Sequence, residues 1–356
     1  MNLVKHSYKS DCIFLLKDLT GILEEITIEE KENLIRQGIS YSEVISKEAV
    51  PSVENVNIFK DMLENSDERM AYYVGKISEE IYRKKGNDLI IVSLARGGTP
   101  YGILVRKYLK FKYNIDIPHY SISIIRGRGI DYNALKYILK NHPNGKMQFI
   151  DGWTGKGSII KELYNSIDIF NKEYGMEIDN SLAVIADPAK LCRIYGTRED
   201  IIIPNCCLNS TVSGLISRTV LNEKFIGKDD FHGAKTLSYL QNEDLSQYFI
   251  DKISAKFTKE DIYFEKLDDI DLNYSKKIVE EISTIYNVKN INNIKLSIGE
   301  TARVLLRRDP RFVLVSDIND KNLANIIHLA KEKDVEIKIY KESGYRAIAL
   351  INEGEI

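Results

Sequence analysis

The fold of this chain is decided by the stretch Phe149-Ile150-Asp151-Gly152-Trp153-Thr154-Gly155-Lys156-Gly157-Ser158. An apolar run that indicates a strand ends here in a glycine-rich turn, and the next segment has apolar residues at helical spacing. Glycines tolerate positive φ and let a ligand approach the backbone, while a helix start offers free N–H groups. The pattern predicts a phosphate site, and the alternative is a tight turn without a ligand. Its residues are Thr154, Gly155, Lys156, Gly157 and Ser158.

Further apolar runs alternate with helical patterns on both sides of this stretch. They span Leu89–Ala95, Tyr120–Ile125, Lys146–Ile150 and Leu182–Ala186. Such alternation predicts a doubly wound α/β fold with a mostly parallel sheet, in which ligands bind beyond the carboxyl ends of the strands. A second glycine-rich loop follows the first of these runs, and we expect it beside the opening stretch. This loop comprises Arg96, Gly97, Gly98 and Thr99.

Length and composition bound the class of protein. A chain of 356 residues exceeds the usual size of one core, so we expect a 1–50 extension, a 51–240 α/β domain, a 241–293 helical connector and a smaller 294–356 α/β domain. The net charge of −2 gives no overall excess of positive charge of the kind that indicates nucleic-acid binding. The four cysteines lack zinc-site or disulfide spacing, and no apolar run has membrane-spanning length. We therefore expect a cytoplasmic protein without a membrane partner.

The two glycine-rich loops resemble the pyrophosphate and phosphoribosyl-pyrophosphate loops of type I phosphoribosyltransferases. Over about residues 41–356, the chain also resembles a bacterial family found with tellurium-resistance and stress genes. That family is described as a phosphoribosyltransferase-like domain joined to a pelota-like RNA-binding domain, and it also carries the label cysteine protease StiP. The motifs that carry the likeness are Ser93–Pro100, His119–Arg126, Asp151–Gly157, Leu208–Gly214 and Asp230–Gly233.

The transferase resemblance implies Mg²⁺-dependent handling of phosphoribosyl pyrophosphate or a related nucleotide, with a base, a nucleoside-like metabolite or RNA as acceptor. The loop N–H groups would bind phosphates, and Asp151 would hold ribose hydroxyls or the Mg²⁺–substrate complex. Arg126 and Arg128 would neutralise the leaving group from a mobile loop, the alternative being a solvated turn. Gly152 stands where type I enzymes carry a second acidic residue. The alternative function is therefore a nucleotide-sensing or RNA-binding protein that has lost catalysis.

A cysteine hydrolase is a different hypothesis, because it needs a thiolate activated by a nearby histidine. Cys206 or Cys207 would be the nucleophile, with His232 or His119 as its partner. Adjacent cysteines are more often small buried hydrophobic residues, which is the alternative.

Two acidic positions are additional candidates. Asp187 precedes Pro188 and is either a site residue or a helix cap. Asp230 and His232 form either a metal or acid–base site or a surface turn.

RNA binding is the third hypothesis. The segment 301–312 resembles the RNA-facing edge of pelota and kink-turn-binding domains, and its arginines would hold the RNA backbone. The alternative is a solvated helix face, since acidic residues nearly balance basic ones over 294–356. The arginines are Arg303, Arg307, Arg308 and Arg311.

Overall fold

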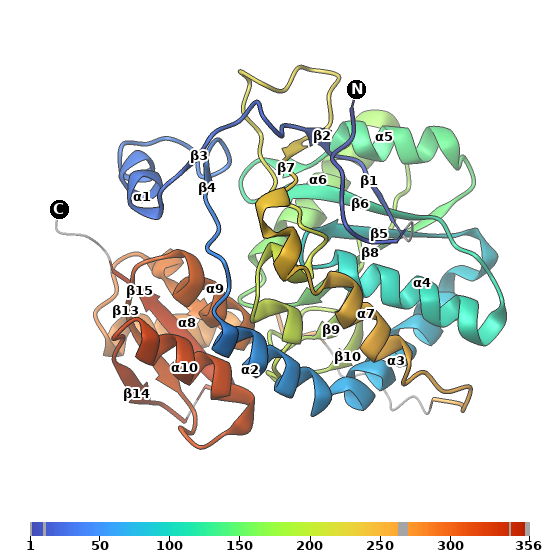
Figure 1. The fold of residues 1–356 in the computed structure, drawn as a ribbon. Coiled ribbons are helices and arrows are strands. Elements are labelled where there is room, and N and C mark those ends of the chain that lie inside the picture. Colours follow the sequence, from blue (N-terminus) through green and yellow to red (C-terminus); the bar gives the residue numbers. More distant parts are fainter. Residues whose placement is uncertain (1, 10–11, 263–269, 342, 353–356) are drawn as a thin grey trace.

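The larger part of the protein is built on one sheet. The structure, a computed structural model, describes residues 2–9, 12–262, 270–341 and 343–352. The main sheet has the order β1-β6-β5-β8-β9-β10, with all these neighbours parallel, while β7 pairs antiparallel with β6 (Figure 1). This confirms the predicted α/β fold with a mostly parallel sheet. The strands are β1 (Ile13–Phe14), β5 (Leu89–Ala95), β6 (His119–Ile125), β7 (Gly129–Ile130), β8 (Lys146–Trp153), β9 (Leu182–Ala186) and β10 (Ile194–Thr197).

Helices cover both faces of the main sheet. Side chains of a strand alternate between faces, so Ile91 packs with α3 and α4, whereas Ile90 and Val92 pack with α5 and α6. Burial on both faces explains why β5 is a continuous apolar run rather than an alternating one. The helices are α3 (Asp67–Lys85), α4 (Thr99–Tyr113), α5 (Tyr132–Asn141) and α6 (Ser158–Tyr174).

Residues 1–50 take part in this domain, because β1 is the edge strand of the main sheet. Shorter pairs tie the segment down further: β2 (Lys17–Asp18) pairs with β11 (Gly233–Ala234), and β3 (Glu25–Ile26) with β4 (Ile45–Ser46). Thr27 and Glu30 form a capping box that starts α1. The remaining helices of this part are α1 (Ile28–Arg36), α2 (Val53–Glu64) and α7 (Ser246–Ser254), of which α7 packs on α3 and α4.

The C-terminal part is the predicted second, smaller α/β domain. Its sheet has the order β12-β15-β13-β14, with α8 on one face and α9 and α10 on the other. The core beneath α9 and α10 is continuous with that of the larger domain, so the two domains share packed surface (Figure 1). The elements are α8 (Tyr274–Ile285), β12 (Ile294–Leu296), α9 (Ile298–Arg307), β13 (Pro310–Val315), α10 (Ala324–Glu332), β14 (Ile337–Ile339) and β15 (Ala347–Ile351).

Short 3₁₀ helices fill the connections. Residues 263–269 of the predicted connector and 353–356 of the predicted C-terminal domain lie outside the described residues. Among the helices that the structure describes, none combines the length and apolar character needed to cross a membrane. The 3₁₀ helices are η1 (Gly86–Asp88), η2 (Pro204–Cys206), η3 (Ser210–Val212), η4 (Ser238–Glu243), η5 (Ile291–Asn293) and η6 (Lys321–Leu323).

Candidate active site

The two glycine-rich loops meet at the carboxyl edge of β5 and β8, because these parallel strands are neighbours. Gly98 packs directly on β8, where an added Cβ would lie 2.3 Å from the carbonyl oxygen of Ile150. Gly97 borders a small cavity instead, and a Cβ there would lie 3.1 Å from Nη2 of Arg303 and 3.5 Å from Oδ1 of Asp151. The first loop and Asp151 therefore lie together.

A cavity of about 510 Å³ lies between the two domains, and we name it the interdomain cleft. A smaller cavity of about 190 Å³ adjoins it and reaches Arg96, Gly97 and Asp151. Trp153 lies in the wall, with the guanidinium carbon of Arg303 4.4 Å from its ring centroid. The larger domain and the C-terminal domain both contribute cations to the lining. They are Arg126, Lys156, Lys295, Arg303, Arg307 and Arg308.

The second glycine-rich turn is partly covered by the C-terminal domain. A Cβ on Gly155 would lie 2.8 Å from Cγ of Glu300, and the Tyr345 hydroxyl donates to the Gly155 carbonyl at 3.1 Å. Lys156 Nζ donates to the Ile291 carbonyl at 2.7 Å. Gly157 has φ of 84° at the start of α6, a conformation that suits glycine. Thr154 and Ser158 also border the cleft.

Burial changes the protonation of two groups in the cleft. It raises the pKa of Asp151 to about 6, although nearby Arg303 acts in the opposite direction. It also lowers the pKa of Lys156 to about 7, with Lys295 and Arg126 adding repulsion. Asp151 therefore exchanges its proton near neutral pH, which suits a general acid or base.

The packing around residue 152 explains why a glycine occupies this position. A Cβ at this position would lie 3.0 Å from Cε2 of the fully buried Tyr101. The acidic residue that type I transferases carry at this position would press against that ring. A second carboxylate at this position would therefore require the Tyr101 ring to move.

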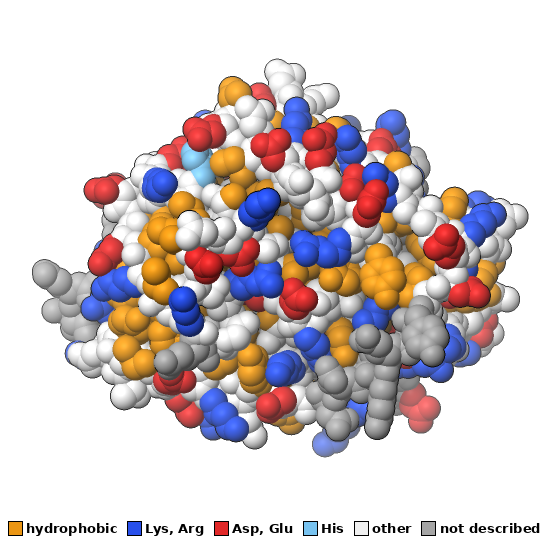
Figure 2. Space-filling view, turned by 90° about the horizontal axis from the view of Figure 1, so that it is seen from below, with side chains coloured by type: hydrophobic (Ala, Val, Ile, Leu, Met, Phe, Trp, Pro, Cys, Tyr) orange, Lys and Arg blue, Asp and Glu red, His pale blue; other side chains and the backbone are white. Residues whose placement is uncertain are grey.

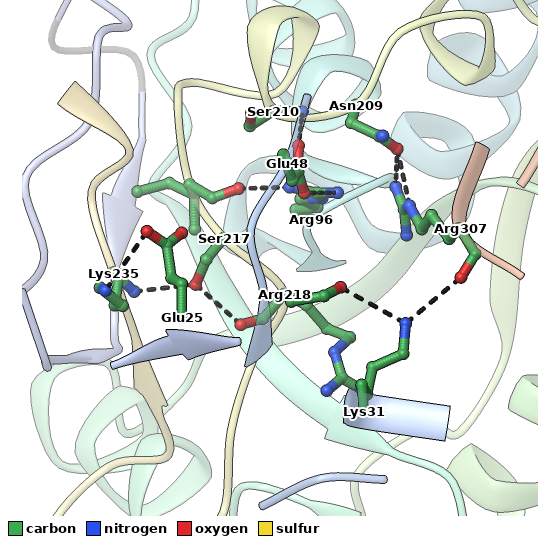
Figure 3. A network of polar contacts seen from close by, with 12 residues as sticks. Glu25, Lys31, Glu48, Arg96, Asn209, Ser210, Ser217, Arg218, Lys235 and Arg307 are labelled. Atoms are coloured by element: carbon green, nitrogen blue, oxygen red, sulfur yellow. Dashed lines mark hydrogen bonds and ion pairs between the residues drawn. The ribbon is translucent and has the colours of Figure 1, made fainter. Parts of the chain in front are cut away.

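Arg96 is held inside the protein. Its guanidinium forms an ion pair with Glu48 at 2.7 Å and donates to the Ile216 carbonyl at 2.6 Å. Glu48 also accepts a hydrogen bond from the Ser210 N–H at 3.0 Å (Figure 3). Thr99 is buried as well, and its hydroxyl bonds that of Ser121.

Arg126 and Arg128 lie on the turn between β6 and β7. The Glu162 carboxylate of α6 accepts hydrogen bonds from the N–H groups of Gly127 and Gly129 at 2.7 and 2.9 Å. Arg126 donates to Asn292 Oδ1 of the C-terminal domain at 2.6 Å, and Arg128 is exposed. The predicted mobile loop is thus anchored at its backbone.

Asp187, Asp230 and His232 have partners within the fold. Asp187 is fully buried and accepts from the Thr154 hydroxyl at 2.6 Å, which fixes the second turn. Asp230 pairs with Lys17 at 2.5 Å. Nδ1 of His232 lies 2.9 Å from the Ser123 hydroxyl.

The cleft is poorly suited to a resident magnesium ion. Within the described residues, no group of three or more His, Cys, Asp or Glu side chains is placed to hold a metal. The cleft offers Asp151 and Glu300 as carboxylates among many cations, whereas Mg²⁺ needs oxygen ligands and tolerates little positive charge nearby. The requirement for magnesium stays a prediction.

All four cysteines are reduced and buried, but their surroundings differ. Burial raises the pKa of Cys192 and Cys207 well above the usual range, and the Cys207 sulfur packs 3.8 Å from that of Met62. Cys12 lies 3.7 Å from Nε2 of His119 inside the core, a pairing across 107 positions that no local sequence signal announces. Cys206 lines a small cavity at the cleft. Its neighbours there include Arg96, Arg303 and Arg307.

The arginines predicted to face RNA point mainly towards the larger domain. Arg303 and Arg307 are four residues apart on α9, so they share one face, and both line the cleft. Arg307 donates to Asn209 Oδ1 (Figure 3). Arg308 pairs with Glu32 at 2.8 Å. Arg311 lies outside the cleft and donates to the Tyr286 carbonyl.

The fold and the cleft define a two-domain protein in which a small α/β domain closes over the carboxyl edge of a parallel sheet. Residues 6–254 match the family described as tellurite-like stress resistance cysteine protease StiP, and residues 273–353 match the PELOTA RNA binding domain. The chain belongs to the StiP family. It is 31% identical over 363 residues to the cysteine protease StiP of Acinetobacter baylyi (strain ATCC 33305 / BD413 / ADP1), covering 98% of this chain and 94% of that relative.

The predicted phosphoribosyl transfer is wrong, since the matching family and the curated relative are both named as cysteine proteases rather than transferases. The residues give a physical reason. Arg96 is neutralised by Glu48, and the turn at Gly155 is covered by the C-terminal domain. Gly152 has no room for the second carboxylate without movement of Tyr101.

Proposed function

We propose that this protein is a thiol-dependent peptidase with Cys206 as its nucleophile, joined to a domain that binds RNA. The observation that carries the proposal is the position of Cys206 beside the arginines of the cleft. All four cysteines are buried, with Cys206 4% and Cys12 6% exposed. Of the four, only Cys206 lines the small cavity that Arg96 and Arg303 also line, whereas Cys12 lies next to His119. The name of the Acinetobacter relative supports thiol chemistry.

Cys206 lines a small cavity together with the guanidinium groups of Arg96, Arg303 and Arg307. Arg303 is partly exposed to the cleft, with 37% of its side chain accessible, and is the cation best placed to meet a substrate. The same positive charge would stabilise the oxyanion that forms during attack on a peptide carbonyl.

Asp151 is the proposed proton carrier. It borders Gly97 in the cavity next to that of Cys206, and its pKa of about 6 lets it hold or release a proton near neutrality. In the first step Asp151 takes the proton of the Cys206 thiol and the sulfur attacks the carbonyl carbon. The C–N bond then breaks, and Asp151 gives the proton to the leaving amine. Water then hydrolyses the thioester, which releases a carboxylate and regenerates the thiol.

The test uses an unfolded, fluorescently labelled polypeptide as substrate. Cys206→Ser should lower the cleavage rate by about 10²-fold or more, while Cys207→Ser, the adjacent matched control, should keep it. Alkylation with iodoacetamide followed by mass spectrometry should modify Cys206 first. Full activity in Cys206→Ser, or first labelling at Cys12, would exclude Cys206 as the nucleophile.

A further inference from the structure

Some cations of the interdomain cleft have no carboxylate partner. Among the described residues, no Asp or Glu oxygen lies within 4.0 Å of the charged nitrogens of this group. Their polar contacts are to neutral groups: Arg126 bonds Asn292, Lys156 bonds the Ile291 carbonyl, and Arg307 bonds Asn209. We name them the unpaired cations: Arg126, Lys156, Lys295 and Arg307.

These like charges work against one another in the folded protein. Burial lowers the pKa of Lys156 and of Lys295, and in both cases nearby Arg126 lowers it further while Glu300 acts in the opposite direction. The face in Figure 2 mixes Lys and Arg with Asp and Glu. Repulsion among these positive charges does not stabilise the folded protein, and a bound polyanion would offset the repulsion.

The cavity also carries groups that suit bases. Tyr41 and Trp153 line it, and 43% of Tyr41 is exposed, whereas Trp153 is 8% exposed and lies beneath the Arg303 guanidinium. Aromatic rings stack on unpaired bases, and the amides of Asn290 and Asn293 can bond base edges or 2′-hydroxyls. A volume of about 510 Å³ is that of a small-ligand pocket, so a duplex does not fit.

We propose that the interdomain cleft binds an unpaired segment of RNA, with its phosphates on the unpaired cations and a base against Tyr41. The match to a PELOTA RNA binding domain favours RNA among polyanions, and Lys295 and Arg307 come from that domain. Arg126 and Lys156 come from the larger domain. Half of the RNA site is therefore built by the domain that carries Cys206. The inference rests on the RNA-binding part of the proposed function and not on peptidase activity.

Trp153 is the only tryptophan of the chain, so its fluorescence reports occupancy of the cleft directly. We would titrate the full chain with an unstructured RNA of about 12 nucleotides at a series of salt concentrations between roughly 50 and 200 mM. RNA should quench Trp153. In Lys156→Gln/Lys295→Gln, affinity should fall roughly tenfold or more, and the log–log salt slope should shrink by about 1.4 for two lost phosphate contacts.

The matched controls are Lys172→Gln, at the exposed far end of α6, and Lys331→Gln, on the exposed surface of α10. Both should bind RNA as the parent does. Circular dichroism checks that each variant is folded, and Lys156→Arg should retain binding, which separates charge from folding. Cys206→Ser should bind RNA normally, which separates this site from the peptidase.

Three outcomes would overturn the proposal. One is that the parent protein does not bind the RNA, and another is that the double variant keeps the parent's affinity and salt slope. The third is that an acidic peptide of equal charge binds more tightly than the RNA, which would identify the cleft as a peptide site instead.

Discussion

Asp200 joins the two domains through a buried carboxylate. Its oxygens accept hydrogen bonds from the N–H of Ile298 at 3.1 and 3.2 Å and from the N–H of Arg346 at 2.9 Å. Ile298 is the first residue of α9, the helix that carries Arg303 into the cleft. Asp200 is only 4% exposed. The ionisation of this one residue should therefore affect how firmly α9 is held.

Burial raises the pKa of Asp200 to about 7, against about 3.9 in an unfolded chain. The folded protein thus holds the proton more tightly than the unfolded one. The stability from this difference is fully present below about pH 4, is lost as the pH rises to about 7, and changes little above that. Between pH 5.5 and 7.5, the loss in the free energy of unfolding is about 2 kcal/mol.

Asp200→Asn keeps a side-chain oxygen that can accept a hydrogen bond and cannot titrate. Urea unfolding, followed by the fluorescence of Trp153 at the domain interface, gives the free energy at both pH values. The parent should lose about 2 kcal/mol more than Asp200→Asn between pH 5.5 and 7.5. The comparison of the parent with Asp200→Asn is needed because Asp151, with a pKa of about 6, also changes its protonation between pH 5.5 and 7.5.

The matched control for this measurement is Asp229→Asn, which removes an exposed carboxylate. The free energy of unfolding of Asp229→Asn should depend on pH in the same way as that of the parent. The reasoning would be refuted if Asp200→Asn also kept that dependence, because the raised pKa would then not act on stability.

Three further perturbations test the interior and the cleft. Gly102→Ala would place a Cβ 2.0 Å from Oγ of Ser93 and 2.4 Å from Nε2 of His119, so it should destabilise the protein by about 1–3 kcal/mol or more in thermal unfolding; an unchanged melting temperature would contradict this packing. RNA affinity, read from tryptophan quenching, should fall as pH rises from about 6 to 8 because Lys156, with a pKa of about 7, loses its charge; in Lys156→Arg this fall should be smaller, and an identical pH profile would exclude Lys156 as its source. Glu48→Gln leaves a buried guanidinium without its charge partner and should cost about 3–5 kcal/mol in urea unfolding, whereas a cost near zero would mean that the pair is not formed.

Local pattern determined much of the fold. The run Leu89–Ala95 and the stretch from Phe149 are apolar and bounded by glycines, so their strands and the parallel sheet followed from the sequence alone. Because the carboxyl ends of parallel strands share one edge, the meeting of Gly97 with Asp151 was also predictable. The motifs likewise indicated the StiP family and its PELOTA domain.

Only the tertiary structure decided which partners these residues contact. The partner of Arg96 is Glu48, and the cavity beside Cys206 exists only because α9 packs over the larger domain. Gly152 stands where a second catalytic carboxylate was expected, and in the structure this position packs closely on the ring of Tyr101. Such pairings join positions far apart in the chain, and their geometry depends on how the two domains share a core. The spacing of residues along the sequence does not encode that geometry, because the charge that a side chain meets is set by the packing around it.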